Sequence, residues 1–215
     1  FPYSEEHQVF LQQDGFLDKE LITVANLSKD ERPINQKWSW DRILRSPYIK
    51  QADTLQGFYF FEAHFSKEEL ARHFDFYEPF TVHESSLSPC VHSIQAAVLN
   101  KMEQAYNFYL RTSRLDLDDY NKEVHEGLHI TSMAGTWMSI VEGFGGMRIK
   151  DGNLTFETRI PKQWKAFSFK VNFRGSIVKV DVSHQETTFT VVGEEDLKIE
   201  LNGKEVEVKA TSTTI

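Results

Sequence analysis

The sequence predicts a helical domain followed by a small antiparallel β-sandwich. Apolar residues recur at helical spacing up to about residue 145, whereas β-branched and aromatic residues alternate with polar ones after about residue 152. Gly145-Gly146 lies between the two patterns and ends the last helical segment. We therefore expect one domain over residues 1–146 and a second over residues 147–215.

The helical half begins with an irregular stretch of about forty residues, which Asp14-Gly15 and Pro33 punctuate. Ser66 and Glu69 have the spacing of a capping box, and Pro89 suits the first position of a later helix. About five helices joined by loops of varied length follow from the apolar spacing. We expect them at 52–65, 66–76, from Ser88 onwards, from about Met102 onwards, and at 131–144.

The second half has a period near two, which is typical of strands with one buried face. Arg174-Gly175 and Asn202-Gly203 mark two turns, and the second is a strong hairpin signal. Phe167, Phe169 and Phe173 fall on the alternating positions and are expected in the core. About six short antiparallel strands indicate a sandwich; we expect them near 154–158, 167–173, 177–182, 187–192, 197–201 and 206–208.

Composition excludes several classes of protein. The 215 residues have a net charge of −8, and residues 147–215 are nearly balanced with 11 Lys and Arg against 10 Asp and Glu. General nucleic-acid binding is therefore not expected, and no apolar run approaches the ~18 residues that span a bilayer. The single cysteine, Cys90, fits a reducing, cytoplasmic location. Because the chain begins with Phe1, we expect it to be a piece of a longer protein.

Four polar stretches interrupt the apolar helices, and each lies just before or between predicted helices. Loops at one end of a helical scaffold are where binding sites usually lie. These stretches are 48–53, 83–88, 116–120 and 125–132.

Three of these stretches have the chemistry of an anion site. Ser85 and Ser86 lie just before a predicted helix, where free backbone N–H groups and the helix dipole favour negative charge. His129 also precedes a helix, and Lys50 beside Gln51 adds a cation and an amide. Each has a simpler interpretation that stays open: N-capping serines, a structural histidine and a surface lysine.

A metal site is the less favoured interpretation. Residues 125–129 read H-E-G-L-H and match the H-E-x-x-H zinc motif, but Gly127 weakens the helix that this motif requires. Asp116, Asp118 and Asp119 lack the glycine and glutamate of a calcium loop, so we expect them to cap helices and bond neighbouring loops. We predict no metal and no cofactor. Trp137 is expected in the helical core.

The same polar stretches resemble the disaccharide phosphorylases of glycoside hydrolase family 65, and most of all its maltose-cleaving members. The resemblance covers nearly the whole chain in the right order. The segments that carry it are Lys50-Gln51-Ala52-Asp53, His83-Glu84-Ser85-Ser86-Leu87-Ser88-Pro89, 114–121, Glu126-Gly127-Leu128-His129-Ile130, Met133-Ala134-Gly135 and 141–146.

The resemblance implies the last helices of an (α/α)6 barrel followed by a C-terminal β-sandwich. It implies inverting phosphorolysis of an α-linked glucose disaccharide, maltose in first place, to β-glucose 1-phosphate and glucose. Inorganic phosphate is then a co-substrate, and the general acid is a glutamate upstream of this stretch. The expected partners are the disaccharide, phosphate, the rest of the enzyme and a second copy in a homodimer. By resemblance, the residues that match the family's phosphate-binding residues are Lys50, Gln51, Ser85, Ser86 and His129. Lys50 and Gln51 also match residues of the family's sugar subsite.

Two alternatives remain at this point. A hydrolase of the same family, acting on trehalose or a related sugar, would need a carboxylate to activate water, and the presence of Lys50 and Ser85 argues against it. The second alternative is a chain that acts without catalysis, either by binding glycans through Trp164 and Phe167 or by supporting the barrel. For residues 147–215 we favour the supporting role.

Overall fold

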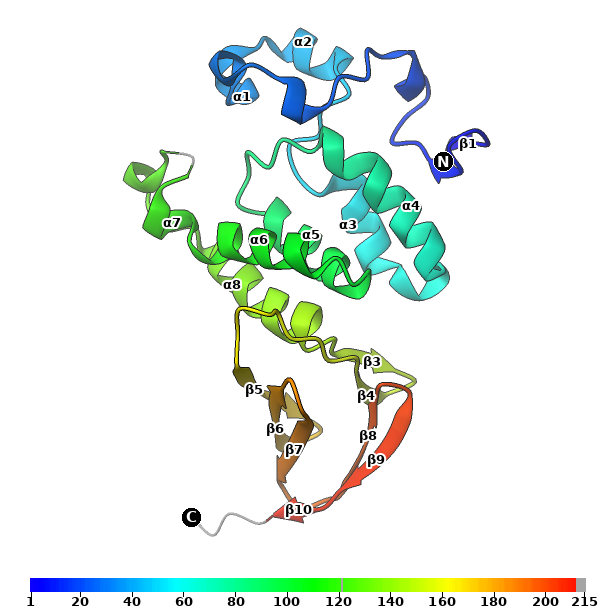
Figure 1. Ribbon diagram of the computed structural model, residues 1–215, viewed down its shortest axis with the longest axis vertical. Helices are drawn as coiled ribbons and strands as arrows, with labels where there is room; N and C mark the ends of the chain where they lie inside the picture. The colour runs from blue at the N-terminus through cyan, green and yellow to red at the C-terminus, as the bar shows by residue number, and fades with distance from the viewer. Residues whose placement is uncertain (121, 212–215) are drawn as a thin grey trace. The chain divides into compact units, whose positions relative to one another are not determined.

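The structure is a computed structural model that describes residues 1–120 and 122–211. These residues form two compact units, which meet in the sequence between Thr136 and Trp137. Helices make up most of the first unit and strands most of the second, as the colours of Figure 1 show along the chain. The predicted order of a helical part and then a β part is confirmed.

The helical unit begins with short elements and continues with longer helices. In chain order the elements are β1 (Tyr3–Ser4), β2 (Val9–Phe10), η1 (Phe16–Asp18), η2 (Val24–Asn26), η3 (Lys29–Glu31), α1 (Ile34–Lys37), α2 (Trp40–Arg45), α3 (Asp53–Phe60), η4 (Glu62–His64), α4 (Lys67–Tyr77), η5 (Glu78–Phe80), α5 (Ser88–Val98), α6 (Met102–Ser113), α7 (Leu115–Asp118), η6 (Val124–Glu126) and α8 (Ile130–Met138).

Helix α4 begins where the capping box predicts. The Ser66 hydroxyl accepts from the backbone N–H of Glu69 at 3.2 Å, and the Glu69 carboxylate accepts from the backbone N–H of Ser66 at 2.8 Å. Its buried face holds the β1–β2 hairpin, because the backbone N–H of Phe10 donates to Nε2 of His73 and the Tyr77 hydroxyl donates to the Phe10 carbonyl. These bonds satisfy polar groups that would otherwise be buried alone.

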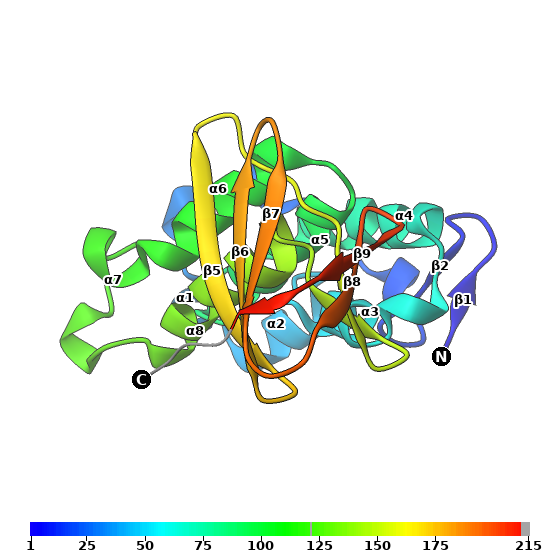
Figure 2. The same cartoon turned by 90° about the horizontal axis from the view of Figure 1, so that it is seen from below.

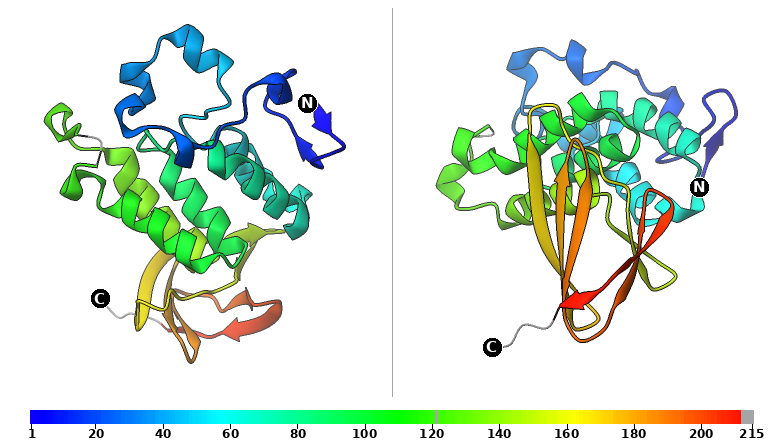
Figure 3. Two further views of the ribbon diagram at one scale, coloured as in Figure 1. Left: turned by 45° about the horizontal axis from the view of Figure 1, so that its top comes forward. Right: turned by 60° about the horizontal axis from the view of Figure 1, so that its bottom comes forward.

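Helix α5 is the centre of the helical unit, and all of its eleven residues are buried. Its partner α6 follows after a three-residue turn through Asn100, whose φ of 59° reverses the chain. The two helices lie side by side as a hairpin (Figure 3). The predicted helices after Ser88 and Met102 are thus confirmed.

Helix α8 packs closely against this hairpin through Gly135. A Cβ atom at Gly135 would lie 2.7 Å from Cβ of Cys90 on α5 and 3.3 Å from Cγ2 of Thr112 on α6. The prediction that Trp137 belongs to the core is wrong, because its side chain is 48% exposed. Gly135 is buried whereas Trp137 lies two residues further along the helix, and a helix of 3.6 residues per turn points those positions in very different directions.

The predicted helix over 131–144 changes its winding before it ends. Helix α8 stops at Met138, and Ser139–Phe144 form a π-helix, η7. The backbone N–H of Gly145 donates to the Ile140 carbonyl, five residues earlier, at 2.7 Å. Gly145 and Gly146 follow at the position where the sequence predicts the break. An extra residue in the turn is invisible to apolar periodicity, which reads only which face is buried.

The β unit is a sandwich of two four-stranded sheets, with orders β10-β7-β6-β5 and β3-β4-β8-β9. Figure 2 shows β5, β6 and β7 side by side, and β8 and β9 paired with each other. The strands are β3 (Arg148–Lys150), β4 (Asn153–Phe156), β5 (Ala166–Phe173), β6 (Ser176–Ser183), β7 (Thr187–Val192), β8 (Leu197–Leu201), β9 (Lys204–Val208) and β10 (Ala210–Thr211).

Strand direction departs from the prediction in two places. Strand β4 pairs with β8 in parallel, and β10 pairs with β7 in parallel, so the sandwich is mixed and not antiparallel throughout. Sequence patterns fix direction only where a tight turn joins neighbours, as at Arg174-Gly175 and Asn202-Gly203, where all four residues have positive φ. Between β4 and β8 the chain passes through three strands of the other sheet, so no turn sets their relative direction.

The core of the sandwich comes from both sheets and follows the predicted alternation. Phe169 lies opposite Val180 in the β5–β6 register, and Val178 lies opposite Val191 across β6–β7. From the other sheet Leu154, Phe156 and Ile199 join them. Phe169 is buried in this cluster, and Phe167 and Phe173 pack against it. Their predicted place in the core is confirmed.

Candidate functional site

Two of the predicted polar loops are joined at their bases by a short parallel bridge. Ile49 pairs with Thr81, and the backbone N–H of Val82 donates to the Ile49 carbonyl at 2.8 Å. Ile49 in turn donates to the Phe80 carbonyl at 2.9 Å. Residues 50–52, which lead into α3, and residues 83–87, which lead into α5, therefore start from one point.

The side chains of these loops make contact beyond the bridge. The Ser85 hydroxyl donates to Oε1 of Gln51 at 3.0 Å and accepts from the backbone N–H of Leu87 at 3.2 Å. The hydroxyls of Ser86 and Thr131 lie 3.3 Å apart, and Thr131 is in the first turn of α8. The starts of α3, α5 and α8 are thus connected, and each presents backbone N–H groups that have no partner within its helix.

His129 lies two residues before Thr131 and is held by Asp116 of α7. The backbone N–H of His129 donates to Oδ2 of Asp116 at 2.9 Å, and its ring Nδ1 lies 2.5 Å from Oδ1 of the same carboxylate. These two hydrogen bonds lower the pKa of the Asp116 carboxyl. The other ring nitrogen, Nε2, lies 3.8 Å from Oε2 of Glu123.

Lys50 is exposed and precedes Gln51 in the same loop. Within the described parts of the chain no hydrogen-bonding or ion-pair partner is found for its ammonium group. The structure therefore links Gln51 with Ser85 directly, brings Ser86 beside the segment of His129 through Thr131, and leaves Lys50 beside them as an uncommitted cation. The assignment of these five residues to phosphate stays a prediction.

Buried side chains fix the loop that carries the serines. Glu84 is buried, accepts from Nε of Arg32 at 3.1 Å and from the backbone N–H of Ile34 at 2.7 Å. Arg32 also donates to the Val82 carbonyl, and Arg111 donates to the His83 carbonyl, both at 2.6 Å. Both neighbours of His83 are therefore held in place, which stabilises its backbone at a positive φ of 53°.

His83 itself is a structural, neutral residue of this loop. Its Nδ1 lies 2.8 Å from the Ser88 hydroxyl, and burial, together with the charges of Arg111 and Arg32, lowers its pKa to about 3. Neither arginine has a sequence signal, because Arg32 lies 52 residues from its partner Glu84 and Arg111 lies 28 residues from His83. Asp116 stood in a predicted polar stretch, but its bond to His129 was not predicted.

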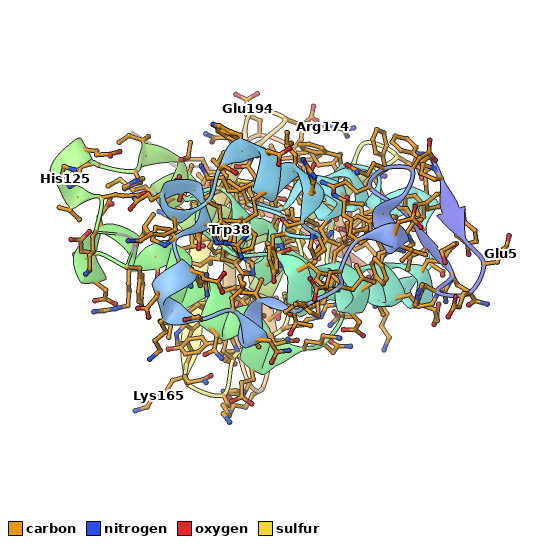
Figure 4. All side chains as sticks on the ribbon, turned by 90° about the horizontal axis from the view of Figure 1, so that it is seen from above. Glu5, Trp38, His125, Lys165, Arg174 and Glu194 are labelled. Carbon is orange, nitrogen blue, oxygen red and sulfur yellow. The ribbon has the colours of Figure 1, made fainter. Side chains whose placement is uncertain are left out.

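The zinc interpretation is excluded by the backbone. His125 and Glu126 lie in the short turn η6, Gly127 follows with a φ of 114°, and His129 precedes α8, so no continuous helix presents the two histidines together. Figure 4 places His125 at the outer edge of the loop between α7 and α8. Among the described residues, no three His, Cys, Asp or Glu side chains are grouped to hold a metal ion.

Two of the three aspartates behave as the sequence predicts. Besides the bond of Asp116 to His129, the Asp118 carboxylate pairs with Arg114 one turn away. Asp119 accepts from the backbone N–H groups of Glu123 and Val124. Asp116 and Asp119 thus bond neighbouring loops, whereas Asp118 makes an ion pair within its own helical segment.

The family models decide the identity of the chain. The glycosyl hydrolase family 65 central catalytic domain matches residues 1–138, and the family 65 C-terminal domain matches residues 147–208. The chain belongs to glycosyl hydrolase family 65. Its helical unit is accordingly part of the family's catalytic barrel, and the expectation drawn from the resemblance is confirmed.

Family 65 relatives with named activities match along most of this chain. It is 53% identical to the maltose phosphorylase of Bacillus subtilis (strain 168) over 92% of its length, and 41% identical to an α,α-trehalose phosphorylase of Thermoanaerobacter brockii over 92%. A solved structure of a candidate kojibiose phosphorylase from the human microbiome has a TM-score of 0.90 at 39% identity over 96% of this chain.

The chain covers only part of these relatives. It spans 26% of each of the two named phosphorylases and 29% of the chain in the solved structure. None of its helices, in the residues that the structure describes, combines the length and apolar character needed to cross a bilayer.

Proposed function

We propose that this chain supplies the phosphate-binding side of an inverting disaccharide phosphorylase whose substrate is maltose. The observation that carries the proposal is the connection of three helix starts by Gln51, Ser85, Ser86 and Thr131. Helix N-termini with nearby hydroxyls and a cation are well suited to an oxyanion. Lys50 and His129 supply the positive and polar groups beside them.

The chemistry asks for such a site and not for a base. Phosphate attacks the anomeric carbon from the face opposite the leaving group, so an O–C1 bond forms while the glycosidic C1–O bond breaks. The leaving oxygen takes a proton, which by resemblance to the family comes from a glutamate outside this stretch. Because phosphate is already an anionic nucleophile, the protein needs to position it and balance its charge.

The bonds of two neighbouring carboxylates favour phosphorolysis over hydrolysis. An inverting hydrolase uses a carboxylate as general base for water. Glu84, next to Ser85, is buried in its bonds to Arg32 and the Ile34 backbone, and Asp116 is bonded to His129. Neither carboxylate is placed to activate a water molecule.

Maltose is proposed as the disaccharide because the maltose phosphorylase of Bacillus subtilis shares 53% of its residues with this chain over the matched region. Inorganic phosphate is the co-substrate, and no cofactor enters the scheme. From the family resemblance we also propose a homodimer, with residues 1–146 in the barrel and residues 147–215 as a supporting domain.

The test uses the full-length enzyme that carries this sequence. It is incubated with maltose, trehalose or kojibiose, each with and without inorganic phosphate, and the sugar phosphate is identified by proton NMR. We expect β-glucose 1-phosphate and an equal amount of glucose from maltose only when phosphate is present. Glucose release at the same rate without phosphate contradicts the proposal, and preference for another disaccharide contradicts the choice of maltose.

A further inference from the structure

The contact between Asp116 and His129 does more than cap a helix. One carboxylate of α7 holds two parts of the same residue thirteen positions away: Oδ2 accepts from the His129 backbone, and Oδ1 lies 2.5 Å from its ring Nδ1. Both side chains are largely buried, with exposed fractions of 15% for Asp116 and 20% for His129. The hydrogen bond to the backbone fixes the position of His129, and the hydrogen bond to Nδ1 fixes the orientation of its ring.

This arrangement defines the protonation of the ring at one nitrogen. An ionised carboxylate can only accept hydrogen bonds, so Nδ1 of His129 carries a proton. The two bonds lower the pKa of the Asp116 carboxyl and keep it ionised. A ligand can therefore meet only Nε2, and the bond made by the other nitrogen decides which ring nitrogen is presented.

The charged groups around the ring are carboxylates. Among the described residues, those facing it are Asp116 from α7 and, at 3.8 Å from Nε2, Glu123 from the segment just before η6. Both are negative. A protonated ring donates from Nδ1 to Asp116 and from Nε2 outward, and a charge-assisted donor to phosphate is stronger than a neutral one.

We propose that Asp116 is a positioning residue of the phosphate site, which turns Nε2 of His129 toward bound phosphate. The inference rests on the proposed function. It differs from a purely structural role, in which the backbone bond alone matters and the ring makes no contact with phosphate.

The main variant is Asp116→Asn in the full-length enzyme, since an amide keeps the size and one acceptor but removes the charge. Loss of a carboxylate partner weakens ligation by histidine at metal sites by 10–100-fold, and we expect a rise in the phosphate KM of roughly tenfold. The maltose KM stays near that of the wild type.

Asp118→Asn is the matched control. Asp118 lies on the same short helix and pairs with Arg114, away from His129. We expect its phosphate KM to match that of the wild type. An equal change in both variants would show a general effect of α7 and would overturn the inference.

A double-mutant cycle with His129→Ala separates positioning from structure. If Asp116 acts through the ring, Asp116→Asn adds almost nothing to the phosphate KM once His129 is alanine. Additive effects of the two substitutions overturn the inference. Should Asp116→Asn fail to fold, a crystal structure of the wild type with phosphate decides: Nε2 within hydrogen-bonding distance of phosphate is expected, and Nδ1 on phosphate would refute the scheme.

The outcomes for this inference and for the proposed function are distinguishable. If the wild type cleaves maltose without phosphate, the proposed function fails. If the wild type depends on phosphate but Asp116→Asn leaves the phosphate KM unchanged, only the positioning role fails.

Discussion

Glu84 is the residue whose loss should do most damage to the serine loop. Its carboxylate accepts from Arg32 at 3.1 Å and from the backbone N–H of Ile34 at 2.7 Å, and its side chain is 7% exposed. In Glu84→Gln the amide keeps the shape, but only one of its two polar atoms accepts. The amide NH2 group, itself a donor, then faces either the Arg32 guanidinium or the Ile34 backbone N–H, which are also donors.

The expected loss of stability follows from burial. Breaking a fully buried ion pair costs about 3–5 kcal/mol. Because Arg32 is 33% exposed, water can solvate part of its charge, and we expect about 2–3 kcal/mol here. At roughly 2 °C per kcal/mol for a larger domain, the midpoint of thermal unfolding should fall by about 5 °C. The phosphate KM should rise as well, since Ser85 and Ser86 follow Glu84 directly.

The matched control is Asp41→Asn, which breaks the exposed pair of Asp41 with Arg45 one helical turn away. Such exposed pairs contribute about 0.3–0.5 kcal/mol. Differential scanning calorimetry and phosphate kinetics on the full-length enzyme measure both variants. If Glu84→Gln melts and binds phosphate like Asp41→Asn, the buried pair does not hold the loop and the reasoning is wrong.

Three further substitutions test other parts of the helical unit. Burial and the neighbouring His83 hold the pKa of His92 well below its ordinary value. The unfolded protein therefore binds a proton at His92 that the folded protein does not, and the free energy of unfolding declines as the pH falls below about 6.5. In His92→Leu the Tm measured from pH 7 to pH 5 should decline less than in the wild type. Gly135→Ala places a Cβ 2.7 Å from that of Cys90. The cost of overpacking, about 1–3 kcal/mol, should outweigh a gain in helix propensity of about 1 kcal/mol. Calorimetry should therefore show a lower Tm, and an unchanged Tm would refute the close packing. Arg111→Ala removes the donor to the His83 carbonyl and should raise the phosphate KM with little change in the maltose KM, whereas equal changes in both would contradict its role in the serine loop.

Sequence patterns predicted the features that depend on contacts between neighbouring residues. The capping box of Ser66 and Glu69 fixed the start of α4, and Asn202-Gly203 fixed the β8–β9 hairpin. Both depend on groups within a few residues of each other. Trp137 and the parallel β4–β8 pair were missed because each depends on which distant segment lies against it.

The candidate site divides in the same way. Ser85, Ser86 and His129 could be proposed because helix starts and polar runs are visible in the sequence. Their support was not found, because Arg32 reaches Glu84 across 52 residues and Asp116 reaches His129 across 13. A side chain that holds another by a single long-range bond leaves no periodic pattern, so only a structure can reveal it.

The bridge between Ile49 and Thr81, together with the contact of Ser86 and Thr131, makes the site a junction of three separate chain segments. A ligand that binds all three is then a cross-link that exists only in the folded state. By mass action, phosphate at ten times its dissociation constant would stabilise the fold by about 1.4 kcal/mol. Phosphate, the proposed nucleophile, would therefore also stabilise the folded enzyme. The fraction of enzyme that remains folded on warming would then depend on the phosphate concentration.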